Sequence, residues 1–164
     1  MDTTRGPRIM VVDDDHQELD RTLEAIRKHG VGYEARIARG GFEALDYLFG
    51  RGRFHERRRH PLPDLILLDF DMAPIDGLEV LRRIRIAEYL PRIPVVILCK
   101  SEDERERVEQ DATGACACVV KPITPECFHE LLMVSGVGGY FLALPPHRAT
   151  LCGENARSAH LHPE

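Results

Sequence analysis

Short apolar runs alternate with segments of helical period along most of this chain. The runs are rich in β-branched residues and fall at residues 9–12, 33–38, 65–68, 95–98 and 116–120. Continuous apolar runs of this length are typical of strands in a parallel sheet that is covered on both faces. The pattern predicts an α/β fold, a single doubly wound five-stranded parallel sheet with helices on both faces.

Amphipathic segments predict a helix after each strand. Residues 16–29 carry apolar residues at spacings of three and four, and the pattern stops at Gly30. Ser101, followed by Glu104, forms a capping box that begins the fourth helix, and Thr124 is the expected N-cap of the fifth. The apolar positions that mark the second and third helices are Phe42, Leu45, Leu48, Leu78, Leu81 and Ile84.

The composition is that of a globular protein. With 164 residues, 43% of them hydrophobic and 30% charged, the chain suits one domain with an appendage. No apolar run is long enough to span a bilayer, and the N-terminus lacks an apolar signal region, so we expect a cytoplasmic protein without membrane contact. A net charge of −5 argues against broad nucleic-acid binding. Five cysteines without a CxxC pair argue against a disulfide framework or a structural zinc site.

Charged residues follow three of the predicted strands directly. In open parallel sheets, ligands bind outside the carboxyl ends of the strands, so these side chains are expected to converge. Taken separately, an acidic run is most often a solvated turn, and a Lys-Pro pair is most often a loop entry. Their position at one edge of one sheet indicates a site instead. The residues concerned are Asp13, Asp14, Asp15, Asp69 and Lys121.

Carboxylates gathered at one edge repel one another unless a cation lies between them. Mg²⁺ prefers oxygen ligands and is commonly held by one or two carboxylates together with a phosphate. Lys121 supplies a positive charge that can pair with a carboxylate or a phosphoryl oxygen. An aspartate beside Mg²⁺ and a lysine is equipped to attack phosphorus. This chemistry explains why a buried strand ends on Asp69, and it predicts an aspartyl phosphate.

The motifs VVDDD, LILLDFDMAPIDG and VVKP occur in that order along the chain. Together they resemble the response-regulator receiver domains of two-component signalling, over residues 8–134. The resemblance implies a flavodoxin-like sheet with strand order 2-1-3-4-5. It also implies phosphoryl transfer from a histidine kinase, with no enzymatic activity beyond slow self-dephosphorylation.

The resemblance implies a role for each matching residue. Asp69 corresponds to the phospho-acceptor, and Lys121 corresponds to the phosphate-binding lysine, which precedes a cis peptide bond to Pro122. Gly77 closes the loop after the third strand. The implied Mg²⁺ ligands are Asp13, Asp14 as the more direct of that pair, Asp69, and the backbone carbonyl of Asp71.

Three positions depart from the family pattern. Cys99 stands where the family has a Thr or Ser that hydrogen-bonds the phosphoryl group, and a thiol is a weak donor. Lys100 stands where the family has a small residue, and Cys118 stands where the aromatic switch residue usually lies. The usual coupling of hydroxyl and aromatic ring therefore cannot operate in its standard form. The two cysteines are either small buried hydrophobes or a redox-sensitive pair.

These departures leave two alternatives to a phosphorylation-dependent regulator. One is a pseudo-receiver, an interaction module that acts independently of phosphorylation. The other is a phosphohydrolase, because DFD resembles the nucleophile and acid of haloacid-dehalogenase-type enzymes. That family requires Thr or Val where Ala73 stands, and it requires a later acidic metal pair that this sequence lacks.

Further segments lie outside the minimal receiver pattern. Residues 51–63 form a basic loop insertion with five arginines, either a solvated loop or a docking patch for an acidic partner. Residues 135–144 form an aromatic-apolar extension that suits a homodimer interface. Residues 1–7 and 145–164 are expected to be tails, the second of them disordered.

The lengthened loop and the extension resemble the stand-alone regulators that partner bacterial phytochrome-type histidine kinases. A bacteriophytochrome is therefore the expected kinase. No DNA-binding module is expected, so output would proceed through protein contacts or by passing the phosphoryl group onward in a relay.

Overall fold

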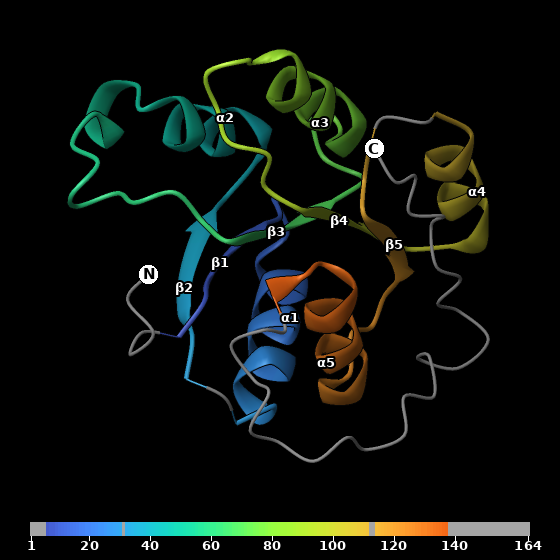
Figure 1. Cartoon of the computed structure of the whole chain (residues 1–164). Coiled ribbons are helices and arrows are strands. Elements are labelled where there is room, and N and C mark those ends of the chain that lie inside the picture. The colour runs from blue at the N-terminus through green and yellow to red at the C-terminus, as the bar shows by residue number, and fades with distance from the viewer. Residues whose placement is uncertain (1–5, 31, 112–113, 138–164) are drawn as a thin grey trace.

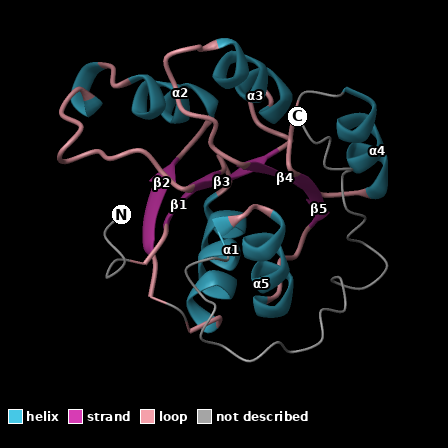
Figure 2. Cartoon of the chain, viewed as in Figure 1, coloured by secondary structure: helices cyan, strands magenta, loops and turns pink. Residues whose placement is uncertain are grey.

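The computed structural model describes residues 6–30, 32–111 and 114–137. These residues form three layers, with a five-stranded parallel sheet between two layers of helices (Figure 1, Figure 2). The strands are β1 (Arg8–Val12), β2 (Glu34–Ala38), β3 (Leu65–Asp69), β4 (Val95–Cys99) and β5 (Ala117–Val120). Their order is β2-β1-β3-β4-β5, which confirms the predicted fold class and strand order.

The helices divide between the two faces of the sheet. The structure has α1 (His16–Lys28), α2 (Gly41–Phe49), α3 (Gly77–Ile86), α4 (Glu102–Asp111) and α5 (Pro125–Val134). Helices α1 and α5 cover one face, and α2, α3 and α4 cover the other (Figure 1). Each face has its own apolar core, and Leu65, Ile66, Leu67 and Leu68 of β3 supply both cores alternately. None of the described helices is long and apolar enough to cross a membrane.

Most of the predicted helix faces point inward, but Phe42 does not. Leu45 and Leu48 are buried, whereas the Phe42 side chain is 48% exposed. Gly41 occupies the position that faces the core, where a Cβ atom would lie 2.7 Å from Ile75 Cγ1. The prediction for Phe42 is wrong because the α2–α3 contact is too close at its first turn to admit a large side chain.

Polar side chains cap the helices that follow β1, β3 and β5. The carboxylate of Asp15 accepts hydrogen bonds from the first turn of α1, and Asp76 does the same for α3. Thr124 Oγ1 accepts from the Cys127 N–H at 3.1 Å, as predicted. These caps hold the helix N-termini beside the carboxyl ends of the strands.

The cap of α4 differs in one bond from the predicted capping box. Ser101 Oγ accepts from the Glu104 N–H at 3.2 Å, as expected. The Glu104 carboxylate, however, accepts from the N–H of Lys100 at 2.7 Å rather than from that of Ser101. The first residue beyond β4 is thereby held to the start of α4.

Residues 51–63 fold back onto the end of α2 and include a short 3-10 turn, η1 (Gly52–Phe54). The guanidinium of Arg57 donates to the carbonyl oxygens of Tyr47 at 2.7 Å and His60 at 3.1 Å, and also to that of Leu48. The Phe54 ring packs 5.1 Å from the Tyr47 ring. The loop is thus a folded part of the domain, while a docking role for its exposed arginines stays a prediction.

The predicted tails and extension lie mostly outside the described residues. The structure describes residues 6–7 of the first tail, residues 135–137 of the extension and none of residues 145–164. Within the described part, α5 ends at Val134, and the following Val137 is buried. The homodimer interface and the disordered tail therefore stay predictions.

Candidate functional site

The strand ends bring a lysine and two aspartates into contact at the carboxyl edge of the sheet. Lys121 Nζ lies 2.7 Å from Asp13 Oδ2 and 2.8 Å from Asp69 Oδ1. The side chains of Lys121, Asp13 and Asp69 are only 6%, 2% and 1% exposed. A buried charge is unfavourable unless it is paired. Removing any one of these three side chains would therefore leave a buried charge with fewer partners.

The strand register explains this convergence. Val12 of β1 pairs with Leu68 of β3, so the next residues, Asp13 and Asp69, leave the sheet side by side. The N–H of Lys121 donates to the Cys99 carbonyl at 2.7 Å and extends the β4–β5 pairing by one residue. The Lys121–Pro122 peptide is cis, as the family resemblance implies, and a second cis peptide joins Ala73 to Pro74.

Asp14 completes a group of three aspartates that we call the acidic cluster: Asp13, Asp14 and Asp69. One carboxylate oxygen from each lies within 4.8 Å of the others. Asp14 is exposed, and its Oδ2 accepts from the Ala73 N–H at 3.3 Å. Oxygen donors of this kind and number suit a divalent cation such as Mg²⁺.

Two observations indicate that the acidic cluster fits a cation. Together with Lys121, which pairs with two of them, the three carboxylates of the acidic cluster carry a formal charge of −2 when all are ionised. Asp69 Oδ2 is buried and has no hydrogen-bond partner among the described residues. A buried acceptor without a donor is unfavourable, and a bound cation would satisfy it.

Burial dominates the titration of Asp69. It raises the pKa of this carboxyl to about 6, against the opposing hydrogen bond and charge of Lys121. Burial by itself would lower the pKa of Lys121, but the hydrogen bonds to Asp13 and Asp69 raise it above its usual value. The lysine therefore stays protonated, and Asp69 becomes easier to ionise when further positive charge approaches.

A second ion pair, which we call the outer ion pair, lies at the exposed side of the site. Lys100 Nζ donates to Asp71 Oδ2 at 3.1 Å. Both side chains are largely in water, with 46% of Lys100 and 61% of Asp71 exposed. The backbone carbonyl of Asp71, which the resemblance implies as a metal ligand, keeps that role as a prediction.

Gly77 allows the β3–α3 loop to close tightly. Its N–H donates to the Phe70 carbonyl at 2.9 Å. A Cβ atom at this position would lie 2.4 Å from the backbone oxygen of Asp69, so any side chain here would displace the end of β3. Gly77 is thus required where the backbone that carries Asp69 meets the first turn of α3.

Cys99 and Cys118 lie on the neighbouring strands β4 and β5. Cys99 Sγ and Cys118 Sγ are 3.0 Å apart, and both residues are buried. The hydrogen bond with Cys118, and then burial, raise the pKa of the Cys99 thiol. A protonated, buried thiol is a poor nucleophile, which favours the interpretation as small hydrophobes over the redox-sensitive pair.

Glu18 and the pairing of Lys100 with Asp71 were not predicted from the sequence. Glu18 Oε2 lies 3.7 Å from Lys121 Nζ and adds a third carboxylate near the lysine. Its place in the first turn of the helix after the Asp13–Asp15 run was the available signal. No comparable signal marked the pairing of Lys100 with Asp71, because the two residues belong to different loops.

Comparison with known families identifies this arrangement. The family model described as the response regulator receiver domain matches residues 9–133 of this chain. The chain belongs to this family. Its receiver domain is 33% identical to the response regulator Rcp1 of Synechocystis sp. over 104 residues, which cover 63% of this chain and 69% of Rcp1.

Other relatives include regulators of different kinds. The receiver domain is 34% identical over 127 residues to the polar-differentiation response regulator DivK of Brucella ovis, with 76% of this chain and 91% of DivK covered. It is also 34% identical over 121 residues to the phosphate regulon transcriptional regulatory protein PhoB of Rhizobium meliloti. That match covers 73% of this chain and 48% of PhoB, so the chain spans about half the length of this relative.

Solved structures similar to the receiver domain include bacteriophytochrome response regulators. AtBRR is 36% identical with a TM-score of 0.73, over 81% of this chain and 94% of AtBRR. RtBRR is 34% identical with a TM-score of 0.74, over 89% of this chain and 86% of RtBRR. The resemblance to phytochrome-type regulators is thereby confirmed.

Proposed function

We propose that this receiver domain accepts a phosphoryl group on Asp69 from the phosphohistidine of a histidine kinase. The observation that carries the proposal is the buried Asp69 carboxylate, paired through Oδ1 with Lys121 while Oδ2 has no hydrogen-bond partner among the described residues. One oxygen is thus held by a cation, and the other is available to react. This is the arrangement that attack on phosphorus requires.

The transfer is a substitution at phosphorus. Asp69 Oδ2 attacks the phosphorus atom, the P–N bond of the phosphohistidine breaks, and the imidazole nitrogen keeps the electron pair and takes a proton from water. Lys121, 2.8 Å from Oδ1, donates to the phosphoryl oxygens as their negative charge moves onto the protein. The product is an aspartyl phosphate on a buried strand end.

Mg²⁺ is the proposed cofactor. Asp13, Asp14 and Asp69 would hold it, together with the backbone carbonyl of Asp71. The ion supplies positive charge that neutralises the phosphoryl oxygens during transfer. The solved structure of a related protein, Rcp1, is described as a Mn²⁺-bound form; it is 27% identical with a TM-score of 0.60, over 85% of this chain and 97% of Rcp1.

A bacteriophytochrome is the proposed kinase, because AtBRR and RtBRR are described as bacteriophytochrome response regulators. The proposal includes a cytoplasmic location, output through protein contacts or a phosphorelay, and no enzymatic activity beyond slow self-dephosphorylation. A homodimer through residues 135–144 also belongs to it, on the sequence argument alone.

The deciding experiment measures the intact mass of the protein after incubation with Mg²⁺ and acetyl phosphate. We expect a phosphoryl adduct on the wild type and none on Asp69→Asn, with circular dichroism showing that the variant is folded. Apparent size, recorded before and after, tests whether phosphorylation changes self-association. An adduct of equal yield on Asp69→Asn would exclude Asp69 as the acceptor.

The same experiment separates the proposal from a pseudo-receiver. The pairing of the Cys99 thiol with Cys118 favours that second candidate, because β4 then offers no hydroxyl to a phosphoryl group. A pseudo-receiver would bind Mg²⁺ without forming an adduct, and it would associate with its partner equally well when Asp69 is replaced.

A further inference from the structure

A phosphoryl group on Asp69 would lack one donor at the end of β4. Cys99 is fully buried, and its thiol contacts Cys118. A phosphoryl group brings nearly two negative charges to a site whose single buried ammonium already pairs with two carboxylates. Mg²⁺ and Lys121 together would supply three positive charges against the nearly four negative charges of Asp13, Asp14 and the phosphoryl group, so a further cationic donor on the exposed side would be favourable.

Lys100 lies where such a donor would act. It follows Cys99 directly, and β4 is paired with β3 so that Asp69 lies opposite Leu98. Its ammonium contacts Asp71, two residues beyond Asp69 in the chain.

The backbone of Lys100 is fixed while its side chain can move. Glu104 accepts the Lys100 N–H at 2.7 Å, which holds the residue at the start of α4. Among the described residues, the ammonium is held only by the outer ion pair, whose two side chains are 46% and 61% exposed. Exposed pairs are weak, so a phosphoryl dianion competes well with the Asp71 carboxylate for this ammonium.

The use of lysine in this chain is selective. Only three of its 22 basic residues are lysines, namely Lys28, Lys100 and Lys121, and the other 19 are arginines. Two of the three lysines, Lys100 and Lys121, lie at the carboxyl edge of the sheet. A compact ammonium on a flexible stem can leave one acceptor and reach another without the fixed planar geometry of a guanidinium.

We propose that Lys100 is a second phosphoryl-binding group, whose ammonium leaves Asp71 and donates to a phosphoryl oxygen on Asp69 in place of a hydroxyl from β4. This inference rests on the proposed phosphorylation of Asp69. It assigns the outer ion pair a function: Asp71 keeps the ammonium beside the site until the phosphoryl group arrives.

The test compares the rate of adduct formation with acetyl phosphate and Mg²⁺ in four variants. Lys100→Met should form the adduct about tenfold more slowly, which is the loss of about 1.4 kcal/mol expected for one charge-assisted hydrogen bond. Lys100→Arg keeps the positive charge but not the compact ammonium, so it should recover only part of the rate. Lys28→Met removes the same charge from the far end of α1 and should match the wild type.

Asp71→Ala distinguishes binding from a structural role. It breaks the same ion pair from the other side but keeps the backbone carbonyl, and by releasing Lys100 it should raise the rate. If Lys100→Met and Asp71→Ala slow the reaction equally, the ion pair is only structural and the inference is wrong. A Lys100→Met rate equal to that of the wild type would overturn it as well.

A binding measurement supports the kinetic one. Calorimetric titration with beryllofluoride and Mg²⁺ should show about tenfold weaker binding of this phosphoryl analogue to Lys100→Met than to Lys28→Met. Failure of the proposed function is a separate result, because the wild type itself would then form no adduct. In that case both the proposed function and this inference fail, whereas an adduct that is insensitive to residue 100 defeats the inference alone.

Discussion

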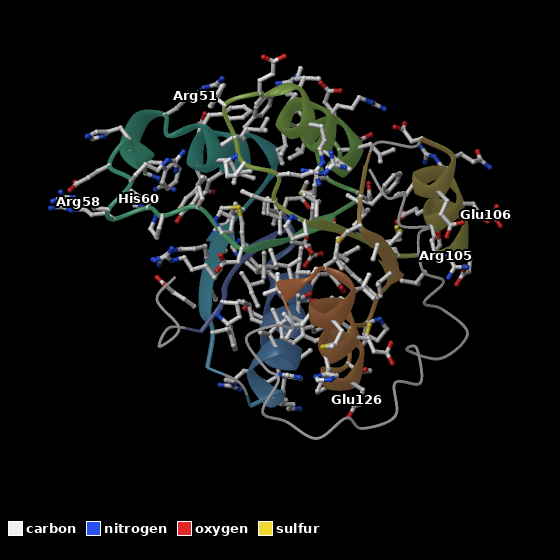
Figure 3. All side chains as sticks on the ribbon, in the orientation of Figure 1. Arg51, Arg58, His60, Arg105, Glu106 and Glu126 are labelled. Carbon is white, nitrogen blue, oxygen red and sulfur yellow. The ribbon has the colours of Figure 1, made fainter. Side chains whose placement is uncertain are left out.

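The carboxyl edge of the sheet and the basic loop of residues 51–63 both concentrate charged residues, but the charged side chains bind different kinds of partner in the two regions. In each region one basic side chain is buried or half-buried, and a second basic side chain is exposed. Lys121 lies between two buried carboxylates, while Lys100 is half in water. Arg57 donates to two carbonyl oxygens at the end of α2, while Arg58 points away from the domain (Figure 3).

The difference lies in the acceptors. The partners of Arg57 are neutral carbonyl oxygens. These hydrogen bonds hold the loop in place and leave no carboxylate that could bind a further cation. The partners of Lys121 are carboxylates that exceed it in charge, so the site still attracts a cation and can exchange one anionic partner for another. A structural charge is satisfied by its surroundings, whereas a reactive site keeps unsatisfied charge.

Replacing Lys121 should have the largest effect on stability. Lys121→Met leaves Asp13 and Asp69 buried without a counter-ion, so we expect the free energy of unfolding to fall by about 4 kcal/mol at pH 7.5 without divalent cations. Urea denaturation measures this loss. Lys100→Met, which breaks only an exposed pair, should cost less than about 1 kcal/mol. Equal losses in the two variants would show that the comparison between buried and exposed charges is wrong.

Replacing Asp69 should raise the free energy of unfolding, whereas replacing Lys121 should lower it. Its pKa is about 6 in the folded protein against 3.8 as its ordinary value, so the folded state binds the proton more tightly than the unfolded state does. The stability that this proton contributes is present below pH 3.8 and is lost as the pH rises through 6. Ionised Asp69 therefore costs about 3 kcal/mol above that range.

Asp69→Asn should accordingly be more stable than the wild type by about 3 kcal/mol at pH 7.5, and the difference should shrink toward zero as the pH falls to 4. Urea denaturation at several pH values, without Mg²⁺, measures it. Added Mg²⁺ should stabilise the wild type and leave Asp69→Asn nearly unchanged. A difference that grows toward low pH would contradict the assigned direction of the pKa.

The basic loop offers a matched pair of smaller changes. Arg57→Met removes the donor to three carbonyl oxygens near the end of α2 and should lower the free energy of unfolding by about 2 kcal/mol. Arg58→Met should stay within about 0.5 kcal/mol, because its side chain is exposed. If both variants behave alike in urea denaturation, the loop is not held by Arg57.

Among the substitutions at buried positions, the smallest effect is expected for Cys99→Val. Cys99→Val keeps the apolar character of a buried side chain with a small increase in volume and should cost about 1 kcal/mol. Cys99→Ser places a hydroxyl among apolar groups and should cost about 2 kcal/mol. Urea denaturation measures both variants. A larger loss in the free energy of unfolding for Cys99→Val than for Cys99→Ser would show that the thiol acts as a polar group beside the site.

Much of the site could be predicted because it depends on backbone topology. A parallel sheet places the carboxyl ends of its strands at one edge, so residues that directly follow neighbouring strands, such as Asp13 and Asp69, must lie near one another. Helix caps such as Thr124 are equally predictable, because a cap bonds to backbone only a few residues away. These features follow from periodicity and local hydrogen bonding.

The sequence by itself therefore determined the α/β fold, the strand ends and the gathering of aspartates around a lysine. Only the tertiary structure decided that Arg57, rather than Arg58, turns inward. It also decided that Gly41, rather than Phe42, faces the core, and that Lys100 pairs with Asp71. The physical reason is the same in each case. These outcomes depend on which side chains meet across different elements, and neither periodicity nor local bonding specifies such contacts.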